Sequence, residues 1–580
     1  MICPDPPDLE PLRETLLFSL IGAAILLAAQ FVFPRAAARV SALVWRRLGL
    51  LASKRSLCGW LLFLAVVIAR VVLLPCFPVP VPGIHDEFSY LLMADTFAHG
   101  RLSNPPHPMW ISFEAFHINF LPRYASMYPP AQGIVLAIGQ LLGNPWIGVV
   151  LACGAMVAVI YWMLLAWLPP RWALLGGDIV WLKFSLTSYW INSYWGGAVS
   201  AAAGALLLGA LARIPRKPTV RDALLLALGL VILANSRPYE GLLFSLPGGF
   251  YLLYWLFRAA STRFTLSARC KTVLLPVLAV LLFTTAAMAA YNRSLTGHAL
   301  RFPETLNVRT YHTAPMFLFQ ASKPQLHYRN QQFEDFYNGW EREEYDHTWE
   351  SVKCLTWLKT VRLFSGFAWW GMLLAAPAFC FVLRDRRMRL PSIALALVAG
   401  GAYVVVWSNA HYAAPATCVV ILLYLQSLRH LRQLGRKTAR RRNPRRKSWN
   451  WATALARASV LLLLADTATA VVRKQCDTFY WTCQGDVSRV VIQRKLEALP
   501  GKHLVMVRYG EDHNIHDDWV FNGAEIDSAK VVWAREIDEQ QDAKLFGYFR
   551  DREIWLVTPD TDNTYLAPYS PPGDRLTGVE

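Results

Sequence analysis

Apolar runs of roughly 20 residues, the length of a helix that crosses the hydrocarbon core of a bilayer, recur along this chain of 580 residues. They constrain its fold more than any other feature. Only 17% of the residues are charged, against about 25% in soluble domains. The sequence therefore predicts a polytopic membrane protein whose membrane part is all α-helical.

We expect about twelve transmembrane helices of this length. They are predicted over residues 15–33, 57–77, 145–168, 172–190, 198–211, 223–234, 242–257, 272–290, 366–383, 391–407, 413–428 and 451–472. A further apolar run at residues 131–142 is too short to cross a bilayer, which indicates a re-entrant or interfacial helix.

Basic segments follow every second predicted span, and two of them, residues 35–55 and 429–447, are especially rich in arginine and lysine. Because basic loops stay in the cytoplasm, the loop at 78–130 and the loop at 291–362 are expected on the outer face of a cell membrane, which we expect to be a bacterial inner membrane. The net charge of +18 is thus mainly a topology signal that also favours contact with membrane lipids. We predict no nucleic-acid partner, and the sequence contains no P-loop or Gly-x-Gly-x-x-Gly motif for a nucleotide.

Residues 473–580 differ in character from the transmembrane part at 1–472. Helices are predicted at 487–499 and 539–549, and strands at 503–509, 530–535 and 553–558. Alternating strands and helices predict a small α/β domain, placed outside the cytoplasm by the span count. Cys476 and Cys483 are plausible disulfide partners on that oxidising side.

The stretch 84–130 follows directly on the second predicted span and is too polar to cross a bilayer itself. It holds the adjacent acids Asp86 and Glu87 and four histidines. Ionisable groups next to a membrane helix are costly unless they line a cavity, so they are candidates for a functional site.

The predicted topology brings further polar residues to the same face. The candidate substrate-binding residues are Arg70, His107, His117, Arg123, Tyr128, Asn192, Trp195, Arg237, Glu240, His411 and Tyr412, and the later outer loop adds Glu304, Arg309 and His312. No metal ligand is assigned among them.

Carboxylates, cations and aromatic rings at a membrane surface suit a reaction on an amphipathic substrate. A carboxylate near a low-dielectric wall has a raised pKa, so Asp86 can take the proton of an attacking hydroxyl. If the leaving group is a phosphate, an arginine must stabilise its charge, and the candidates are Arg237, Arg123 and Arg70.

The run Asp86-Glu87-x-x-Tyr90, followed by Ala94, Gly100 and Tyr128-Pro129-Pro130, resembles the first outer loop of the C-type membrane glycosyltransferases (GT-C). It is similar in pattern to the protein O-mannosyltransferases and the lipid A aminoarabinose transferases. The likeness extends more loosely to Arg237-Pro238-x-Glu240-Gly241 and to His411-Tyr412-x-x-Pro415. It covers neither the first span nor the α/β tail.

The resemblance implies a transferase that uses a sugar linked to a polyprenyl phosphate, with a lipid, protein or glycan acceptor. It also implies no obligatory cofactor, although a divalent metal is possible. Asp86 would be the general base and Glu87 a second catalytic group that positions acceptor or donor. Tyr128 stands where relatives have a basic residue, which transfers the phosphate contact to Arg123 or Arg237.

Structural interpretations stand beside these functional ones. Acids favour the first turn of a helix, and Tyr128-Pro129-Pro130 suits a helix start. The acidic segment 511–518 is typical of a solvated loop as well as of a metal site. Alternative functions are a transporter or lipid-carrier flippase, which predicts matching halves with broken helices, and a non-catalytic partner in glycan assembly.

Overall fold

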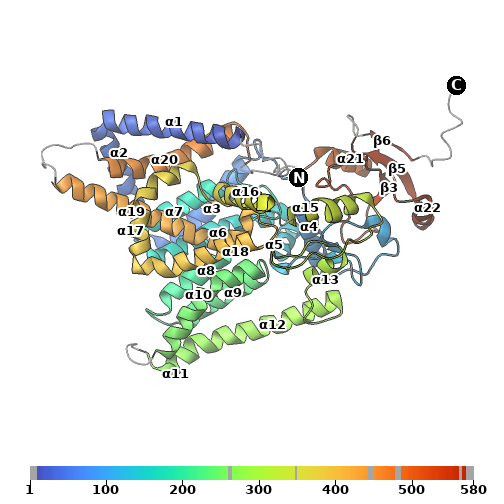
Figure 1. Ribbon diagram of the computed structural model, residues 1–580, viewed down its shortest axis with the longest axis horizontal. Helices are drawn as coiled ribbons and strands as arrows, with labels where there is room; N and C mark the ends of the chain where they lie inside the picture. Colours follow the sequence, from blue (N-terminus) through green and yellow to red (C-terminus); the bar gives the residue numbers. More distant parts are fainter. Residues whose placement is uncertain are drawn as a thin grey trace.

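A computed structural model of the chain describes residues 10–258, 264–345, 349–441, 450–476, 485–560 and 565–569. Figure 1 shows a helical body at one end of the molecule and a small sheet at the other, with the first outer loop between them. Helix α12 runs along one edge of the body, away from most of the other helices.

The first half of the body contains α1 Glu10–Val32, α2 Pro34–Leu51, α3 Arg55–Val72, α4 His85–Ala98, η1 Trp110–Phe113, β1 Ile118–Asn119, β2 Ala125–Ser126, α5 Pro130–Leu141, α6 Pro145–Trp167, α7 Pro170–Phe184, α8 Ala198–Arg213, α9 Val220–Ala234 and α10 Pro238–Phe257. The second half contains α11 Leu266–Arg269, η2 Cys270–Leu274, α12 Leu275–Thr296, α13 Pro303–Thr310, α14 Gln331–Phe333, η3 Glu334–Trp340, α15 Glu341–Tyr345, α16 Trp349–Phe367, η4 Trp370–Ala378, α17 Phe379–Arg384, η5 Arg386–Met388, α18 Arg389–Val404, η6 Ala410–Ala416, α19 Thr417–Arg441 and α20 Trp451–Val472. The chain ends with α21 Val487–Ala498, β3 Lys502–Val507, β4 Val531–Arg535, α22 Glu539–Tyr548, β5 Arg552–Thr558 and β6 Tyr565–Pro568.

Within the described residues, six helices are long and apolar enough to cross a bilayer. They lie at Arg13–Val32, Arg55–Val72, Pro145–Trp167, Leu266–Thr296, Ala410–Arg436 and Trp451–Val472. A seventh span is possible if Val352–Phe367 and Trp370–Arg384, which meet at 91°, cross together. The chain is thus a multi-pass membrane protein, but the predicted number of twelve spans stays a prediction.

Most of the remaining predicted spans correspond to helices that are shorter or broken, whereas 242–257 lies in α10, which has 20 residues and contains Pro247. Helices α7, α8, α9 and α18 have 15, 16, 15 and 16 residues. The predicted spans 172–190 and 391–407 run past the ends of α7 and α18, because the residues that follow these two helices include further apolar and aromatic side chains. The piece at 185–197, predicted as the end of a span and a loop, is a buried non-helical segment between α7 and α8.

The polar stretch after α3 begins with α4, whose N-terminal residues Asp86 and Glu87 lie in its first turn. Acids are favoured there by the helix dipole. Tyr128 is followed by two prolines that start α5, where proline suits the first helical position. The twelve-residue α5 packs against α4 and α6, and it is too short to span, as predicted.

The C-terminal sheet has the strand order β4-β3-β5-β6. Strand β3 is parallel to both β4 and β5, and β6 is antiparallel to β5. The five helices and strands predicted from 487 to 558 all appear, with their bounds within one or two residues. The extracytoplasmic placement of residues 473–580 as a separate domain stays a prediction.

The two faces of this sheet have different partners, because side chains alternate along each strand. On one face Leu504, Met506 and Val532 pack against Phe113 and Ile118 of the first outer loop. On the other face the sheet is covered by α21. The first outer loop is therefore sandwiched between the helical body and the sheet.

The predicted Cys476–Cys483 disulfide cannot be followed, because Cys483 lies outside the described residues. Cys476 and Cys354 are both disulfide-bonded.

Candidate active site

A cavity of about 440 Å³ lies where the first outer loop meets the later outer loop and the ends of α10 and α18. Its polar lining includes Asp86, His117, Tyr128, Arg237, Glu240, Glu304, His312, Glu341, Arg362, Tyr412 and His516. Its apolar lining includes Met127, Pro129, Trp195, Met288, Phe302, Met316, Phe317 and Trp407. One cavity thus offers both ionisable and apolar surface, as an amphipathic substrate requires.

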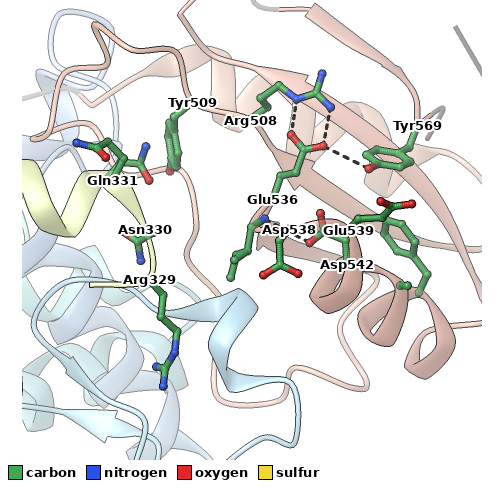
Figure 2. A pocket seen from close by; sticks show the side chains of 14 residues that line it. Arg329, Asn330, Gln331, Arg508, Tyr509, Glu536, Asp538, Glu539, Asp542 and Tyr569 are labelled. Atoms are coloured by element: carbon green, nitrogen blue, oxygen red, sulfur yellow. Dashed lines mark hydrogen bonds and ion pairs between the residues drawn. The ribbon is translucent and has the colours of Figure 1, made fainter. Parts of the chain in front are cut away.

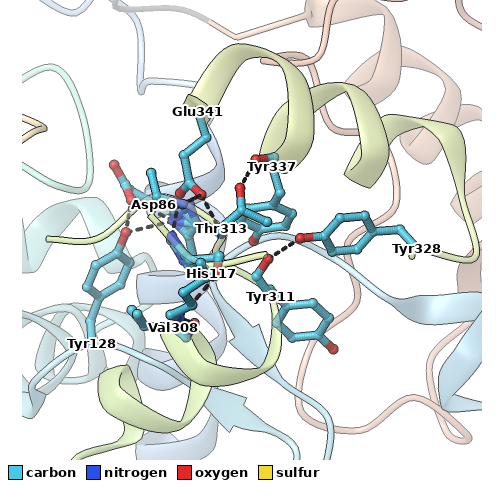
Figure 3. Close-up of polar contacts among 12 residues, drawn as sticks. Asp86, His117, Tyr128, Val308, Tyr311, Thr313, Tyr328, Tyr337 and Glu341 are labelled. Carbon is cyan, nitrogen blue, oxygen red and sulfur yellow. Dashed lines mark hydrogen bonds and ion pairs between the residues drawn. The ribbon is translucent and has the colours of Figure 1, made fainter. Parts of the chain in front are cut away.

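Asp86 lies at the centre of a hydrogen-bonded group in this cavity (Figure 3). The Tyr128 hydroxyl donates to Asp86 Oδ1. His117 Nδ1 lies 3.1 Å from the same oxygen and 2.8 Å from the Tyr128 hydroxyl. Tyr128 and His117 together hold the Asp86 carboxylate in one orientation, and both contact its Oδ1 atom.

The backbone of His117 fixes the position of its ring. His117 has φ of 61°, which is uncommon for a residue other than glycine. Its carbonyl accepts hydrogen bonds from Met127 N (3.1 Å) and the Ser89 hydroxyl (2.7 Å). Backbone strain of this kind costs of order 1–3 kcal/mol and concentrates at functional sites. The short β1–β2 hairpin therefore constrains the residue that contacts Asp86.

Glu87 has a different environment from its neighbour in sequence. It is 4% exposed and does not line the cavity. One carboxylate oxygen accepts from Gly83 N at 2.8 Å and the other from Tyr194 N at 2.7 Å. Glu87 thus joins the start of α4 to the 185–197 segment, and we describe it as a positioning residue.

Arg237 precedes α10 and lies over the Tyr412 ring, 3.9 Å from its centroid. The cavity also contains the acids Glu240 and Glu304. Trp195, which lines the cavity as well, packs against His411 with ring centroids 4.4 Å apart. A guanidinium is therefore present in the same cavity as Asp86, among several acidic and aromatic groups.

A second polar cluster completes the cavity on the side of the later outer loop (Figure 3). Glu341, which is fully buried, contacts His312 Nδ1 and accepts from the backbone N–H groups of Thr313 and Ala314 at 3.0 and 3.1 Å. His312 in turn faces His117, with ring centroids 6.2 Å apart. Among the described residues, neither His117 Nε2 nor His312 Nε2 has a hydrogen-bond partner.

Burial governs the protonation of these groups. It raises the pKa of Asp86 to about 7, and the positive charge of Arg237 opposes this rise. Burial also raises the pKa of Glu87 to about 7, against the backbone N–H donors of Gly83 and Tyr194. It lowers the pKa of His117 to about 3, with a further contribution from His312. Asp86 therefore titrates near neutral pH beside a neutral histidine, as a general base requires.

Two of the predicted substrate-binding residues form a buried structural pair. Arg70 is fully buried and donates to the carbonyls of Phe77 (2.8 Å) and Pro78 (3.3 Å) and to Asn192 Oδ1 (2.7 Å). Neither Arg70 nor Asn192 lines the cavity. The sequence suggested Arg70 as a partner for a phosphate, whereas in the structure its guanidinium holds the chain that leaves α3.

Three more predicted residues lie away from the cavity lining. His107 pairs with Asp527 of the C-terminal unit at 3.0 Å, and Arg123 is exposed. His411 is buried beside Tyr189, whose hydroxyl lies 3.1 Å from His411 Nδ1. Loop membership predicted that these residues lie on one side of the membrane but could not predict which of them line one cavity.

The sequence did not propose Glu341, Arg362 or His516 for this site, although the structure brings all three to the cavity. Glu304 and His312, which the predicted topology assigned to the later outer loop, also line the cavity. Glu341 and Arg362 belong to a long polar-aromatic segment in which no pattern separates them from their neighbours.

The acidic segment 511–518 does not form a metal cluster. His513 Nδ1 contacts Asp560 at 2.7 Å, and Asp518 lies 3.8 Å from Arg535. In the ranges that the structure describes, no group of three or more histidine, cysteine, aspartate or glutamate side chains is placed to hold a metal ion. The possible dependence on a divalent metal stays a prediction.

Comparison with known proteins finds likeness in fold rather than in sequence. No family model and no curated protein sequence matches the chain. ArnT from Cupriavidus metallidurans in the apo state aligns with a TM-score of 0.47 and 13% identity, over 87% of this chain and 93% of that one. The same protein bound to undecaprenyl phosphate aligns with a TM-score of 0.41 and 13% identity, over 86% and 93%.

A third solved structure is the archaeal oligosaccharyltransferase AglB from Archaeoglobus fulgidus, in complex with an inhibitory peptide and a dolichol-phosphate. It aligns with a TM-score of 0.39 and 11% identity, over 86% of this chain and 69% of that one. With identities below 25% and TM-scores below 0.5, the assignment of a reaction rests on the cavity itself.

Proposed function

We propose that the chain is an integral membrane glycosyltransferase that moves a sugar from a polyprenyl-phosphate carrier to an acceptor hydroxyl or amide on the outer face. Asp86 is the general base. The acceptor atom forms a bond to the anomeric carbon of the sugar, the bond from that carbon to the phosphate oxygen breaks, and the acceptor proton passes to Asp86. Polyprenyl phosphate leaves with the electron pair of the broken bond.

The observation that carries this proposal is the environment of Asp86. Its carboxylate lies in a cavity rather than in the packed core, Tyr128 and His117 orient one of its oxygens, and burial raises its pKa to about 7. A general base whose pKa lies near the working pH is largely ionised and is still basic enough to accept the proton of the acceptor group. Its sequence neighbour Glu87 has neither access to the cavity nor a free oxygen.

The remaining cavity residues suit the two ends of such a donor. Arg237 can stabilise the negative charge that grows on the departing phosphate, and Arg362 offers a second guanidinium in the same cavity. Met288 on α12 and the apolar residues around Phe317 provide a wall for the hydrocarbon chain. His117 Nε2 and His312 Nε2, which are buried at the cavity wall without a hydrogen-bond partner among the described residues, are the candidate contacts for sugar hydroxyls.

The test is a transfer assay with purified protein in nanodiscs, a polyprenyl-phosphate-linked sugar and a membrane extract as acceptor source. We expect polyprenyl phosphate to be released in proportion to sugar incorporated. Arg237→Gln should lower turnover by about 10²–10³-fold, the usual cost of a lost electrostatic stabiliser. Arg123→Gln is the matched control, because Arg123 is exposed and outside the cavity.

Movement of the intact carrier across the bilayer without release of polyprenyl phosphate would contradict the proposal and support a flippase. Equal activity of the two arginine variants would contradict the role of Arg237.

A further inference from the structure

A second cavity, of about 630 Å³, lies between the later outer loop and the C-terminal sheet, apart from the candidate active site. Figure 2 shows Arg329, Asn330 and Gln331 on one side of it and Arg508, Glu536 and Asp542 on the other. It shares no lining residue with the cavity that holds Asp86. The proposed reaction assigns no task to it.

The sheet topology explains why a cavity forms there. Strand β3 lies between β4 and β5 and runs parallel to both, so the chain leaves β3 toward one neighbour and returns on its other side. Ligands of such sheets bind at the carboxyl ends of the strands, near the point where the order reverses. Arg508 and Tyr509 follow β3 directly, and Glu536 follows β4.

The lining combines fixed acceptors and donors. Arg508 forms a two-pronged ion pair with Glu536, and the Tyr569 hydroxyl donates to Glu536 at 3.3 Å. Asp542 is 4% exposed and accepts from Ile537 N at 3.3 Å. These side chains are held in place before any ligand arrives.

One buried polar group in the lining has an unused donor. Asn330 is 8% exposed, and its Oδ1 accepts from Phe333 N at 2.9 Å, which caps the helical segment that follows. Its Nδ2 is buried without a hydrogen-bond partner among the residues described. Nδ2 itself has less than 1 Å² of exposed surface, so a ligand reaches it only after a small movement of the Asn330 side chain, which lines the cavity. Leaving a buried donor unpaired costs about 1–3 kcal/mol, and that cost favours the movement and a ligand that accepts from Nδ2.

The chemistry of the lining narrows the ligand class. Two carboxylates already lie at the N-terminus of α22: Asp538 Oδ1 accepts from Gln541 N at 2.8 Å, and Glu539 lies in the first turn. Their negative charges disfavour an anionic ligand at this end of the helix. Within the described residues the carboxylates are not grouped to hold a metal ion. A simple cation would meet Arg329 and Arg508 in the same wall. Hydroxyl groups, which donate and accept together, suit interspersed carboxylates, amides and guanidinium groups.

We propose that this cavity binds a saccharide unit through its hydroxyl groups, with Asn330 and Asp542 as its specific contacts. The choice of a saccharide, as the glycan part of an acceptor, rests on the proposed function. The binding itself is independent of Asp86.

The experiment is saturation-transfer difference NMR on the full chain in nanodiscs, since alkyl-glycoside detergents would compete. The probes are the neutral disaccharides maltose, cellobiose and N,N′-diacetylchitobiose, titrated separately, and a tri-lysine peptide. We expect saturable transfer to at least one disaccharide and none to the peptide. Asn330→Asp, which keeps the capping oxygen but removes the donor, should weaken binding roughly tenfold.

Asp542→Asn should weaken binding to a similar degree, whereas Asp512→Asn should leave it unchanged, because Asp512 is exposed and lines neither cavity. An unchanged unfolding temperature of Asn330→Asp separates lost binding from lost folding. The inference is overturned if no disaccharide shows transfer, if the peptide alone binds, or if both cavity variants bind as the native chain does. Asp86→Asn should still bind the disaccharide, so loss of transferase activity and loss of this binding are distinguishable.

Discussion

Replacing Glu87 with glutamine is expected to weaken the attachment of α4 to the 185–197 segment while leaving the reacting groups in place. The two Glu87 oxygens accept from Gly83 N and Tyr194 N at 2.8 and 2.7 Å in a site that is 4% exposed. Glutamine keeps one acceptor and leaves one buried N–H unpaired, at a cost of about 1–3 kcal/mol. Alanine leaves both unpaired, so we expect about twice that loss.

The measurement is the apparent unfolding temperature of the purified variants in nanodiscs, together with sugar transfer. Glu87→Gln should unfold at a temperature lower by a few degrees, Glu87→Ala at a lower one still, and Glu87→Gln should keep much more activity than Asp86→Asn. If Glu87→Gln unfolds like the native chain and loses activity as completely as Asp86→Asn, Glu87 is a catalytic group and the interpretation of its buried contacts is wrong.

Three further predictions concern Asp86 and Tyr128 of the first outer loop and Arg70 of α3, which contacts the chain that leads into this loop. Because the base must be ionised, kcat/KM should rise with pH through a value near 7, the pKa to which burial raises Asp86; a flat profile from pH 5 to 9 would refute this. Tyr128→Phe removes a hydrogen bond that favours the ionised carboxylate, so the rising limb should move to higher pH, and a shift to lower pH would contradict the contact. Arg70→Ala leaves the Phe77 and Pro78 carbonyls and the Asn192 amide without their donor and should reduce stability by at least about 3 kcal/mol. A folded Arg70→Ala protein with a raised KM for the lipid donor would instead favour substrate binding.

Sequence patterns located the important segments because they report on hydropathy and helix chemistry. The first outer loop was identified from polar residues placed directly after an apolar run, and Tyr128-Pro129-Pro130 predicted the start of α5. In the C-terminal part, the alternation of short apolar strands and amphipathic helices predicted β3, β4 and β5 within one or two residues. These features depend on local sequence, so a single chain suffices to find them.

The roles of several site residues depend on contacts with residues distant in sequence, which local sequence patterns do not predict. Asp86 lines the cavity, whereas its neighbour Glu87 accepts hydrogen bonds from two backbone N–H groups. The sequence could not predict this difference, because one of the two donors, Tyr194, is 107 residues away from Glu87. Arg70 was misplaced for a similar reason: its acceptor Asn192 belongs to a distant, non-helical segment. Glu341 and Arg362 reach the cavity only because the later outer loop folds back over the first.

The most direct test of the central claim is the rate of sugar transfer by Asp86→Asn, measured beside Asp512→Asn in equally folded protein. Asparagine keeps the size of Asp86 and one oxygen that can accept from the Tyr128 hydroxyl, but it cannot take a proton at neutral pH. The expected result is a fall of about 10²–10⁴-fold in turnover, the usual contribution of a general base, with no change for Asp512→Asn. Turnover by Asp86→Asn equal to that of the native chain would show that Asp86 is not the base.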